Sequence, residues 1–145
     1  MRIIFGTDAN GAQQAAMIRA EGEKLGTCID VSEYDATHRD YIRVSAAVCS
    51  RVRKAKAVGV LLCGTGAGTA ICANKHKGIY AVTCFDPEQA CNARRINNAN
   101  VVCIAATTDI ETNLAILRAF VTTRYHNRKP HRIRAVKALE RKLCK

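Results

Sequence analysis

A cysteine followed by alternating glycines is the part of this sequence that points most directly to chemistry. Residues 60–69 run from apolar side chains into Cys63, after which Gly64, Gly66 and Gly68 alternate with small residues. Such a run predicts a strand, a tight turn and the start of a helix. Glycines let a backbone approach a ligand closely, and the free N–H groups at a helix start favour an anion or a thiolate. The segment therefore predicts an anion-binding turn beside a reactive sulfur.

Two reactions suit a thiolate beside backbone amides. One is nucleophilic attack on a carbonyl, and the other is removal of a proton next to a carbonyl while the amides stabilise an enediolate. No histidine is obviously paired with Cys63, which disfavours a cysteine–histidine hydrolase. The glycine spacing matches neither the phosphate-binding loop that ends in Gly-Lys-Ser/Thr nor the G-x-G-x-x-G pattern of dinucleotide sites.

The elements that must position this turn alternate along the chain. Continuous apolar runs predict strands, and apolar positions three to four residues apart predict the helices between them. The expected strands are residues 3–5, 27–31, 58–62, 79–83 and 101–105, and the expected helices are residues 11–25, 40–55, 70–75, 87–96, 114–121 and a basic last helix after Pro130. This alternation predicts the α/β class: a single domain over residues 1–145, with a doubly wound, Rossmann-like, parallel five-stranded sheet and helices on both faces.

Residues that directly follow the strands are the candidate site residues, because ligands bind beyond the carboxyl ends of the strands in such sheets. Asp8 follows the first expected strand, Cys63 follows the third, and a loop after Val82 follows the fourth. We therefore expect Asp8 and Cys63 to lie near each other at one edge of the sheet.

The composition is that of a globular protein, with 145 residues of which 48% are hydrophobic and 24% charged. No apolar stretch approaches the roughly 20 residues of a membrane helix, and the N-terminus predicts a strand rather than a signal peptide. The eight cysteines form no C-x-x-C pair and lack zinc-finger spacing, so we expect buried, reduced thiols and no metal site. These features predict a cytoplasmic protein that does not associate with membranes.

Positive charge is concentrated at the end of the chain. The net charge is +11, and residues 124–145 hold nine Lys and Arg against the single acid Glu140, a net of +8. Such a basic helix and tail predict an anionic partner: nucleic acid, a phosphorylated small molecule or an acidic subunit surface. A solvated helix face is the alternative. Because aromatic residues are scarce and Trp is absent, nucleic-acid binding is the weakest of these hypotheses.

Several short motifs, in order along nearly the whole chain, resemble those of the ribose-5-phosphate isomerase B / galactose-6-phosphate isomerase family. Cys63-Gly64-Thr65-Gly66-Ala67-Gly68, followed by Ala73-Asn74-Lys75 and Gly78-Ile79, resembles the most distinctive block of that family. The supporting matches are Gly6-Thr7-Asp8-Ala9-Asn10-Gly11, Asp40-Tyr41, Asn97-Asn98-Ala99-Asn100-Val101, and His131 with Arg134.

The resemblance implies an aldose–ketose isomerase that works through a cis-enediolate without a metal or other cofactor. Cys63 would move the proton between C1 and C2, and Asn97 and the amides of the turn through Gly64, Thr65, Gly66 and Gly68 would hold the oxyanion. The implied substrate contacts are Asp8 and Asp40 on sugar hydroxyls, Tyr41 lining the pocket, and His131 and Arg134 towards the phosphate. The resemblance also implies a homodimer or a dimer of dimers with sites between subunits, and ribose 5-phosphate/ribulose 5-phosphate is the preferred substrate pair.

Four positions depart from the pattern of the family. Ala9 and Ile96 replace histidines that face the phosphate and open the sugar ring, and Thr107 and Pro130 replace arginines. These departures keep two alternatives open. One is a divergent member that acts on another sugar phosphate, such as galactose 6-phosphate or an open-chain tetrulose phosphate. The other is a non-catalytic or partner-dependent subunit.

Overall fold

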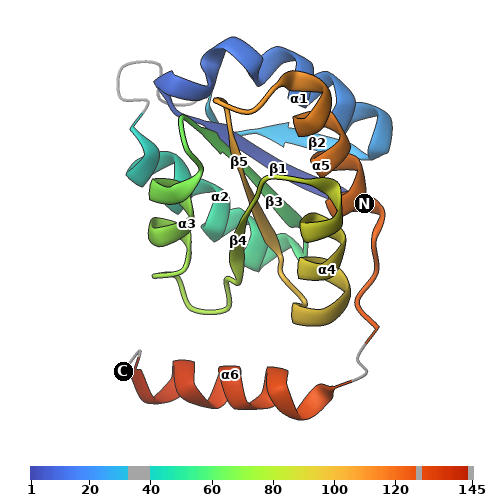
Figure 1. Ribbon diagram of the computed structural model, residues 1–145. Coiled ribbons are helices and arrows are strands. Elements are labelled where there is room, and N and C mark those ends of the chain that lie inside the picture. Colours follow the sequence, from blue (N-terminus) through green and yellow to red (C-terminus); the bar gives the residue numbers. More distant parts are fainter. Residues whose placement is uncertain (33–39, 127–128, 144–145) are drawn as a thin grey trace.

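The computed structural model describes residues 1–32, 40–126 and 129–143, and within these ranges it shows one parallel sheet (Figure 1). The strands are ordered β2-β1-β3-β5-β4, and every pairing is parallel. The elements run as follows: β1 (Arg2–Thr7), η1 (Ala9–Gly11), α1 (Ala12–Leu25), β2 (Thr27–Asp30), α2 (Tyr41–Ala55), β3 (Val58–Cys63), α3 (Ala67–Ala73), β4 (Ala81–Cys84), α4 (Pro87–Asn97), β5 (Val101–Ala105), α5 (Ile110–Thr122) and α6 (Pro130–Leu143). The α/β class and the five parallel strands predicted from the sequence are confirmed.

Helices cover both faces of the sheet, and each face has its own hydrophobic core (Figure 1). Helices α1, α4 and α5 pack on one face, where Phe5 and Phe120 are fully buried. Helices α2 and α3 pack on the other face, around Val48 and Leu61. Because the central strand β3 is buried along its whole length, its sequence is a continuous apolar run rather than an alternating one.

Polar residues fix several element boundaries. Asp40, Asp86 and Asp109 each cap the first turn of the helix that follows them, by accepting hydrogen bonds from backbone N–H groups. The strand expected at residues 79–83 begins at Ala81, because Ile79 and Tyr80 belong to the turn before it. The third strand extends one residue further than expected and includes Cys63.

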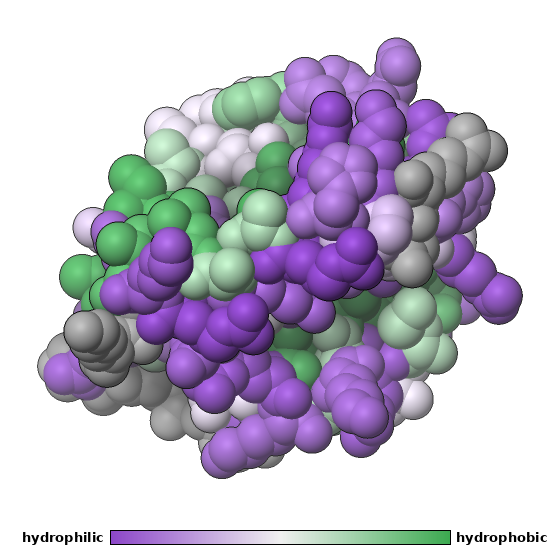
Figure 2. Space-filling model, turned by 90° about the horizontal axis from the view of Figure 1, so that it is seen from below, coloured by the Kyte–Doolittle hydropathy of each residue, from purple (hydrophilic) through white to green (hydrophobic). Residues whose placement is uncertain are grey.

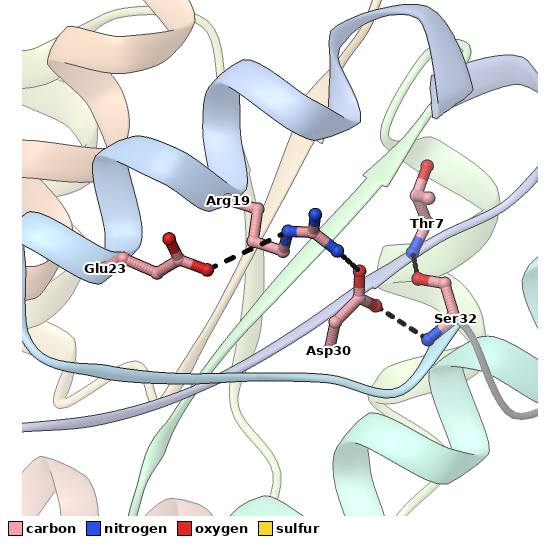
Figure 3. Close-up of polar contacts among 5 residues, drawn as sticks. All are labelled: Thr7, Arg19, Glu23, Asp30 and Ser32. Carbon is pink, nitrogen blue, oxygen red and sulfur yellow. Dashed lines mark hydrogen bonds and ion pairs between the residues drawn. The ribbon is translucent and has the colours of Figure 1, made fainter.

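A set of polar contacts ties β1 to its neighbours at the carboxyl edge (Figure 3). The backbone N–H of Thr7 donates to Ser32 Oγ at 2.8 Å, and Ser32 N–H donates to Asp30 Oδ1 at 2.8 Å. Arg19 of α1 pairs with Asp30 at 3.3 Å and with Glu23 at 3.9 Å. These contacts fix the end of β1, from which Asp8 follows.

Helix α6 lies apart from the two packed layers (Figure 1). None of its described residues is buried, and the side chains of Val136, Leu139 and Leu143 are 45%, 56% and 73% exposed. Its polar link to the rest of the chain is a hydrogen bond of 2.5 Å from the N–H of Gly78 to Glu140 Oε1. The apolar side chains of α6 thus stay largely open to solvent, with Val136 facing Tyr80 and Ile96 across a small cavity.

Among the residues that the structure describes, no helix is both long and apolar enough to cross a membrane.

Candidate active site

The Cys63 side chain ends β3 and is held by the turn that follows it. The residue is only 5% exposed, and its Sγ accepts a hydrogen bond from the N–H of Gly66 at 3.1 Å. Thr69 Oγ1 lies 3.4 Å from the same sulfur. A backbone N–H aimed at sulfur stabilises negative charge there, so this thiol has the surroundings of a reactive cysteine.

The turn itself requires glycine at position 66. Gly66 has φ 75°, and a Cβ there would lie 2.6 Å from Thr83 Cγ2. Its carbonyl accepts hydrogen bonds from the hydroxyls of Thr69 and Thr83, at 3.0 and 3.1 Å. The conformation that aims the Gly66 N–H at the thiol is therefore fixed from both sides.

Other backbone groups of the turn remain available to a ligand. The carbonyl of Gly64 accepts from Thr107 N–H at 3.2 Å, which anchors the turn to the end of β5. In the described structure, the N–H groups of Thr65 and Gly68 make no hydrogen bond to another residue. These donors precede or begin α3, where the partial charge of a helix start favours an anion.

Asp8 lies at the same edge as Cys63, as the sequence predicts. Thr7 is in register with Leu62, and the N–H of Asp8 donates to the Leu62 carbonyl at 3.2 Å. The Asp8 carboxylate is 4% exposed and accepts from the N–H of Gly11 at 3.0 Å and from Asn10 Nδ2 at 3.3 Å. It thereby also holds the short helix η1 beside the thiol.

Tyr41, the first residue of α2, reaches the glycine turn, and Asp40 caps the start of that helix. Asp40 Oδ1 accepts from the N–H groups of Ile42 and Arg43 at 2.8 and 2.9 Å. The Tyr41 ring lies against Gly68, where a Cβ would be 3.2 Å from two ring carbons. Since Tyr41 is also 42% exposed, it forms an open wall of the turn.

Asn97 lies at the opposite edge of the sheet and does not reach Cys63 within one chain. It ends α4, and nearby Asn100 donates from its N–H to the Tyr80 carbonyl and accepts from Gly59 N–H at 2.8 Å. Gly59 is four residues before Cys63 on β3, which at the rise of a strand is about 13 Å. Asn97 lies far from Cys63 because α4 runs antiparallel to the strands, so its last residue returns to their amino ends.

His131 and Arg134 also lie away from the thiol, exposed on α6. Beside Asn97 the structure shows two cavities that share Ile96. One of about 340 Å³ is lined by Arg95, Ile96, His126 and Lys129, and one of about 190 Å³ is lined by Tyr80, Ile96, Asn97, Arg132, Ile133 and Val136. The predicted residues therefore form two groups, one around Cys63 and one around Asn97 and α6.

Thr69 and Thr83 are site residues that the sequence did not indicate. Their hydroxyls determine how the turn holds Cys63, yet a threonine in a helix or strand is unremarkable by type alone. The signal available was their place: Thr69 is the third residue of the helix that the glycine turn starts.

Neighbouring thiols differ from Cys63 in their surroundings. Burial raises the pKa of Cys49 to about 12 and that of Cys84 to about 11. Burial likewise raises the pKa of Cys103, which contacts Thr69. These thiols stay protonated at neutral pH and belong to the core. Among the described residues, no three His, Cys, Asp or Glu side chains gather where they could hold a metal ion.

The fold and this site define a Rossmann-like α/β protein whose thiol and free amides meet at the carboxyl edge of a parallel sheet. A family model described as Ribose/Galactose Isomerase matches residues 3–138, and the chain belongs to that family. At the level of class, it is a sugar-phosphate isomerase.

The chain is similar to two proteins named as sugar-phosphate isomerases and to one longer protein whose name gives another role. The structure of type B ribose 5-phosphate isomerase from Trypanosoma cruzi superposes with a TM-score of 0.91 at 30% identity, covering 98% of this chain and 99% of that one. D-erythrulose-4-phosphate isomerase of Pectobacterium atrosepticum is 33% identical over 109 residues, which is 73% of this chain and 72% of the relative. DNA damage-repair/toleration protein DRT102 of Arabidopsis thaliana is 38% identical over 137 residues; the match covers 90% of this chain but only 42% of that longer protein.

Proposed function

We propose that this chain interconverts an aldose phosphate and a ketose phosphate, with ribose 5-phosphate and ribulose 5-phosphate as the preferred pair, and that Cys63 transfers the proton. The observation that carries the proposal is the Gly66 N–H bound to Cys63 Sγ at 3.1 Å, next to the unoccupied N–H groups of Thr65 and Gly68. A proton acceptor and oxyanion donors are then adjacent, which is what an enediolate reaction needs.

The reaction follows from these groups. The Cys63 thiolate removes the proton from C2 of the open-chain aldose, and the electron pair of that bond forms C1=C2 while O1 gains negative charge. The N–H groups of Thr65 and Gly68 stabilise the charged oxygen. The hydroxyl proton then moves from O2 to O1, and the Cys63 thiol returns its proton to C1, giving the ketose. Asp8 and Asp40 would hold sugar hydroxyls, and Tyr41 would form the wall beside them.

A second copy of the chain would complete the site. One chain holds Asn97, His131 and Arg134 away from Cys63, so these groups serve the reaction only if a partner brings them to the thiol edge. The apolar side chains of α6 support such a pairing, because their exposure is characteristic of an interface. Figure 2, which looks at this side of the molecule, shows a largely hydrophilic surface with hydrophobic side chains gathered towards its left. We infer a homodimer, or a dimer of dimers, with sites between subunits.

The phosphate would bind among the cations next to Asn97. Ala9, Thr107 and Pro130 supply none of the cationic contacts that the family pattern has there. The cavity of about 340 Å³ beside Ile96 offers Arg95, His126 and Lys129 instead, on the same side of the chain as α6. A dianionic phosphate suits this lining better than a neutral sugar hydroxyl does.

An open-chain tetrulose phosphate is the second candidate substrate, and Ile96 is the observation that favours it. The side chain is 49% exposed at the position of the ring-opening histidine, and it can neither donate nor accept a proton. A four-carbon sugar phosphorylated on its terminal hydroxyl cannot close a furanose ring and needs no such group. The similarity to a D-erythrulose-4-phosphate isomerase is consistent with this alternative.

Turnover of both substrate pairs by the wild-type and Cys63→Ala proteins tests the proposal. We expect wild type to convert at least one pair and Cys63→Ala to lose conversion by at least about 10³-fold, because the group that carries the proton is gone. Cys28→Ala, which removes a thiol from β2, is the matched control and should retain wild-type rates. A folded wild-type protein that turns over no aldose or ketose phosphate would instead support a non-catalytic or partner-dependent subunit.

A further inference from the structure

Thr69 is a buried hydroxyl with two competing partners. The residue is 1% exposed, and its Oγ1 lies 3.4 Å from Cys63 Sγ and 3.0 Å from the carbonyl oxygen of Gly66. A hydroxyl has a single proton, so Thr69 can donate to only one of them at a time. The carbonyl can only accept, whereas the sulfur donates as a thiol and accepts as a thiolate.

Thr83 allows the Thr69 proton to move between these two partners without leaving the Gly66 carbonyl unbonded. Its Oγ1 donates to the same Gly66 carbonyl at 3.1 Å, from β4 on the other side of the turn. If the Thr69 proton turns towards sulfur, the carbonyl therefore keeps a donor and is not left unsatisfied. The Gly66 N–H stays on Cys63 Sγ throughout, since the positive φ of Gly66 fixes its direction.

We propose that Thr69 is a positioning residue that reverses its hydrogen bond with Cys63 as the thiol loses and regains its proton. In the thiol form, Cys63 S–H donates to Thr69 Oγ1, and Thr69 donates to the Gly66 carbonyl. In the thiolate form, Thr69 donates to Cys63 Sγ, and Thr83 alone serves the carbonyl. The proposal rests on Cys63 being the proton carrier of the proposed function; Thr69 itself is too deeply buried to touch a substrate.

The other titratable groups near this arrangement do not take over the role. Cys103 of β5 contacts Thr69, but burial keeps it a neutral thiol. Asp8, after β1, has its carboxylate bound to Gly11 and Asn10. Tyr41 of α2 packs on Gly68, on the outer side of the turn. The hydroxyl of Thr69 is thus the side-chain polar group that the described structure places against the sulfur.

The test is the pH dependence of Cys63 alkylation, which does not require turnover. Iodoacetamide would be reacted with the intact protein across a pH series, and modification of Cys63 would be followed by peptide mass spectrometry. We expect Thr69→Val to raise the pH of half-maximal reaction by about one unit, because the thiolate loses a donor, and Thr69→Ser to restore the wild-type midpoint. Cys103→Ala is the matched control and should leave the midpoint in place.

Steady-state kinetics give a second measurement. Thr69→Val should lower kcat about tenfold with little change in KM, since the thiolate and not the substrate loses a contact. Thr83→Val should raise the alkylation midpoint by a smaller amount, because the Gly66 carbonyl then competes for the Thr69 proton. Thr83→Val carries the test if circular dichroism shows that Thr69→Val does not fold.

The outcomes separate the two proposals. An unchanged midpoint in folded Thr69→Val, or in Thr83→Val where Thr69→Val does not fold, overturns the role of Thr69 even if the protein is an isomerase. A shifted midpoint in a protein without isomerase activity keeps Thr69 as the partner of Cys63 and rejects the proposed function. A shift of the same size in Cys103→Ala would assign the effect to core packing and also overturn the inference.

Discussion

At the scale of residues, a backbone N–H that donates to its sulfur distinguishes Cys63 from the other cysteines that the structure describes. Cys49, Cys84 and Cys103 are also buried, but burial raises their pKa and keeps them as small apolar side chains. Cys63 has a backbone N–H from the turn and a hydroxyl from the first turn of α3 at its sulfur. The sequence predicts this difference, because Cys63 alone is followed by the glycine run. It does not predict Thr69, whose role depends on the direction of its hydroxyl.

A second residue-scale prediction concerns Glu21, which joins α1 to α5. Its carboxylate accepts from Arg118 Nε at 2.5 Å and from Lys24 Nζ at 3.0 Å, and these bonds lower its pKa to about 2. A lowered carboxyl pKa stabilises the fold above about pH 4.5, and this contribution is lost as the pH falls towards 2. We predict that Glu21→Gln lowers the melting temperature at pH 7 and that its difference from wild type shrinks as the pH falls through this range.

Thermal unfolding followed by circular dichroism at pH 7, 4 and 3 measures this effect. Glu23→Gln is the control, because Glu23 is 60% exposed and its ion pair with Arg19 is long, at 3.9 Å. A surface pair of that kind contributes little. A Glu21→Gln difference that stays constant from pH 7 to pH 3 would contradict the assignment of the stability to the charged carboxylate.

At the scale of elements, the parallel strands place the site, and the turn after β3 gives it its shape. The sequence predicts that Asp8 and Cys63 share an edge, since both lie at the carboxyl ends of parallel strands, and β1 indeed pairs with β3. It predicts equally that α4 follows β4. What strand and helix patterns do not show is that the family motif divides between edges, with Asn97 at the far end of α4.

Two glycines with positive φ, Gly66 and Gly78, allow the effect of the Cys63 turn to be separated from the effect of backbone strain by itself. Gly66→Ala introduces strain at φ 75° and a Cβ 2.6 Å from Thr83, whereas Gly78→Ala introduces strain at φ 80° with no atom within 4 Å. We predict that Gly78→Ala costs about 1–2 kcal/mol of stability through its backbone and that Gly66→Ala costs more. Urea unfolding measures both.

Activity gives the second comparison between these variants. Gly66→Ala should also lower kcat at least tenfold, because the N–H on Cys63 Sγ moves, while Gly78→Ala should leave kcat close to wild type. Equal losses of kcat in the two variants would mean that the turn contributes to stability and not to the hydrogen bond between Gly66 N–H and the thiol.

At the scale of the whole molecule, the two groups of site residues lie at opposite edges of one sheet, with α6 exposed beside the second group (Figure 1). The sequence of α6 does not predict whether the helix packs on the sheet, because an amphipathic basic pattern fits a packed helix and a detached one equally well. The single domain and the cytoplasmic location expected from the sequence stay predictions, as does the pairing of two copies.

Mixing two inactive variants tests whether the sites lie between chains. Cys63→Ala keeps Asn97, and Asn97→Ala keeps Cys63, so a mixed dimer holds one site with both groups intact. We predict that each variant alone has little activity and that co-refolding equal amounts restores about a quarter of wild-type activity, as random pairing in a two-fold dimer requires. Cys63→Ala co-refolded with a Cys63→Ala,Asn97→Ala double variant is the control and should restore none. Absence of recovery in the first mixture would contradict sites shared between chains, and wild-type activity of Asn97→Ala alone would place Asn97 outside the reaction.

The separation of Cys63 from Asn97 by the length of β3 also affects how catalysis depends on dilution. A folded monomer would carry half of each of two sites and a whole copy of none. The number of working sites would then rise with the square of the chain concentration until pairing is complete, so the rate per chain would fall on dilution while every chain stayed folded. In such a protein, the abundance of the chain sets both the amount of catalyst and the fraction of it that works.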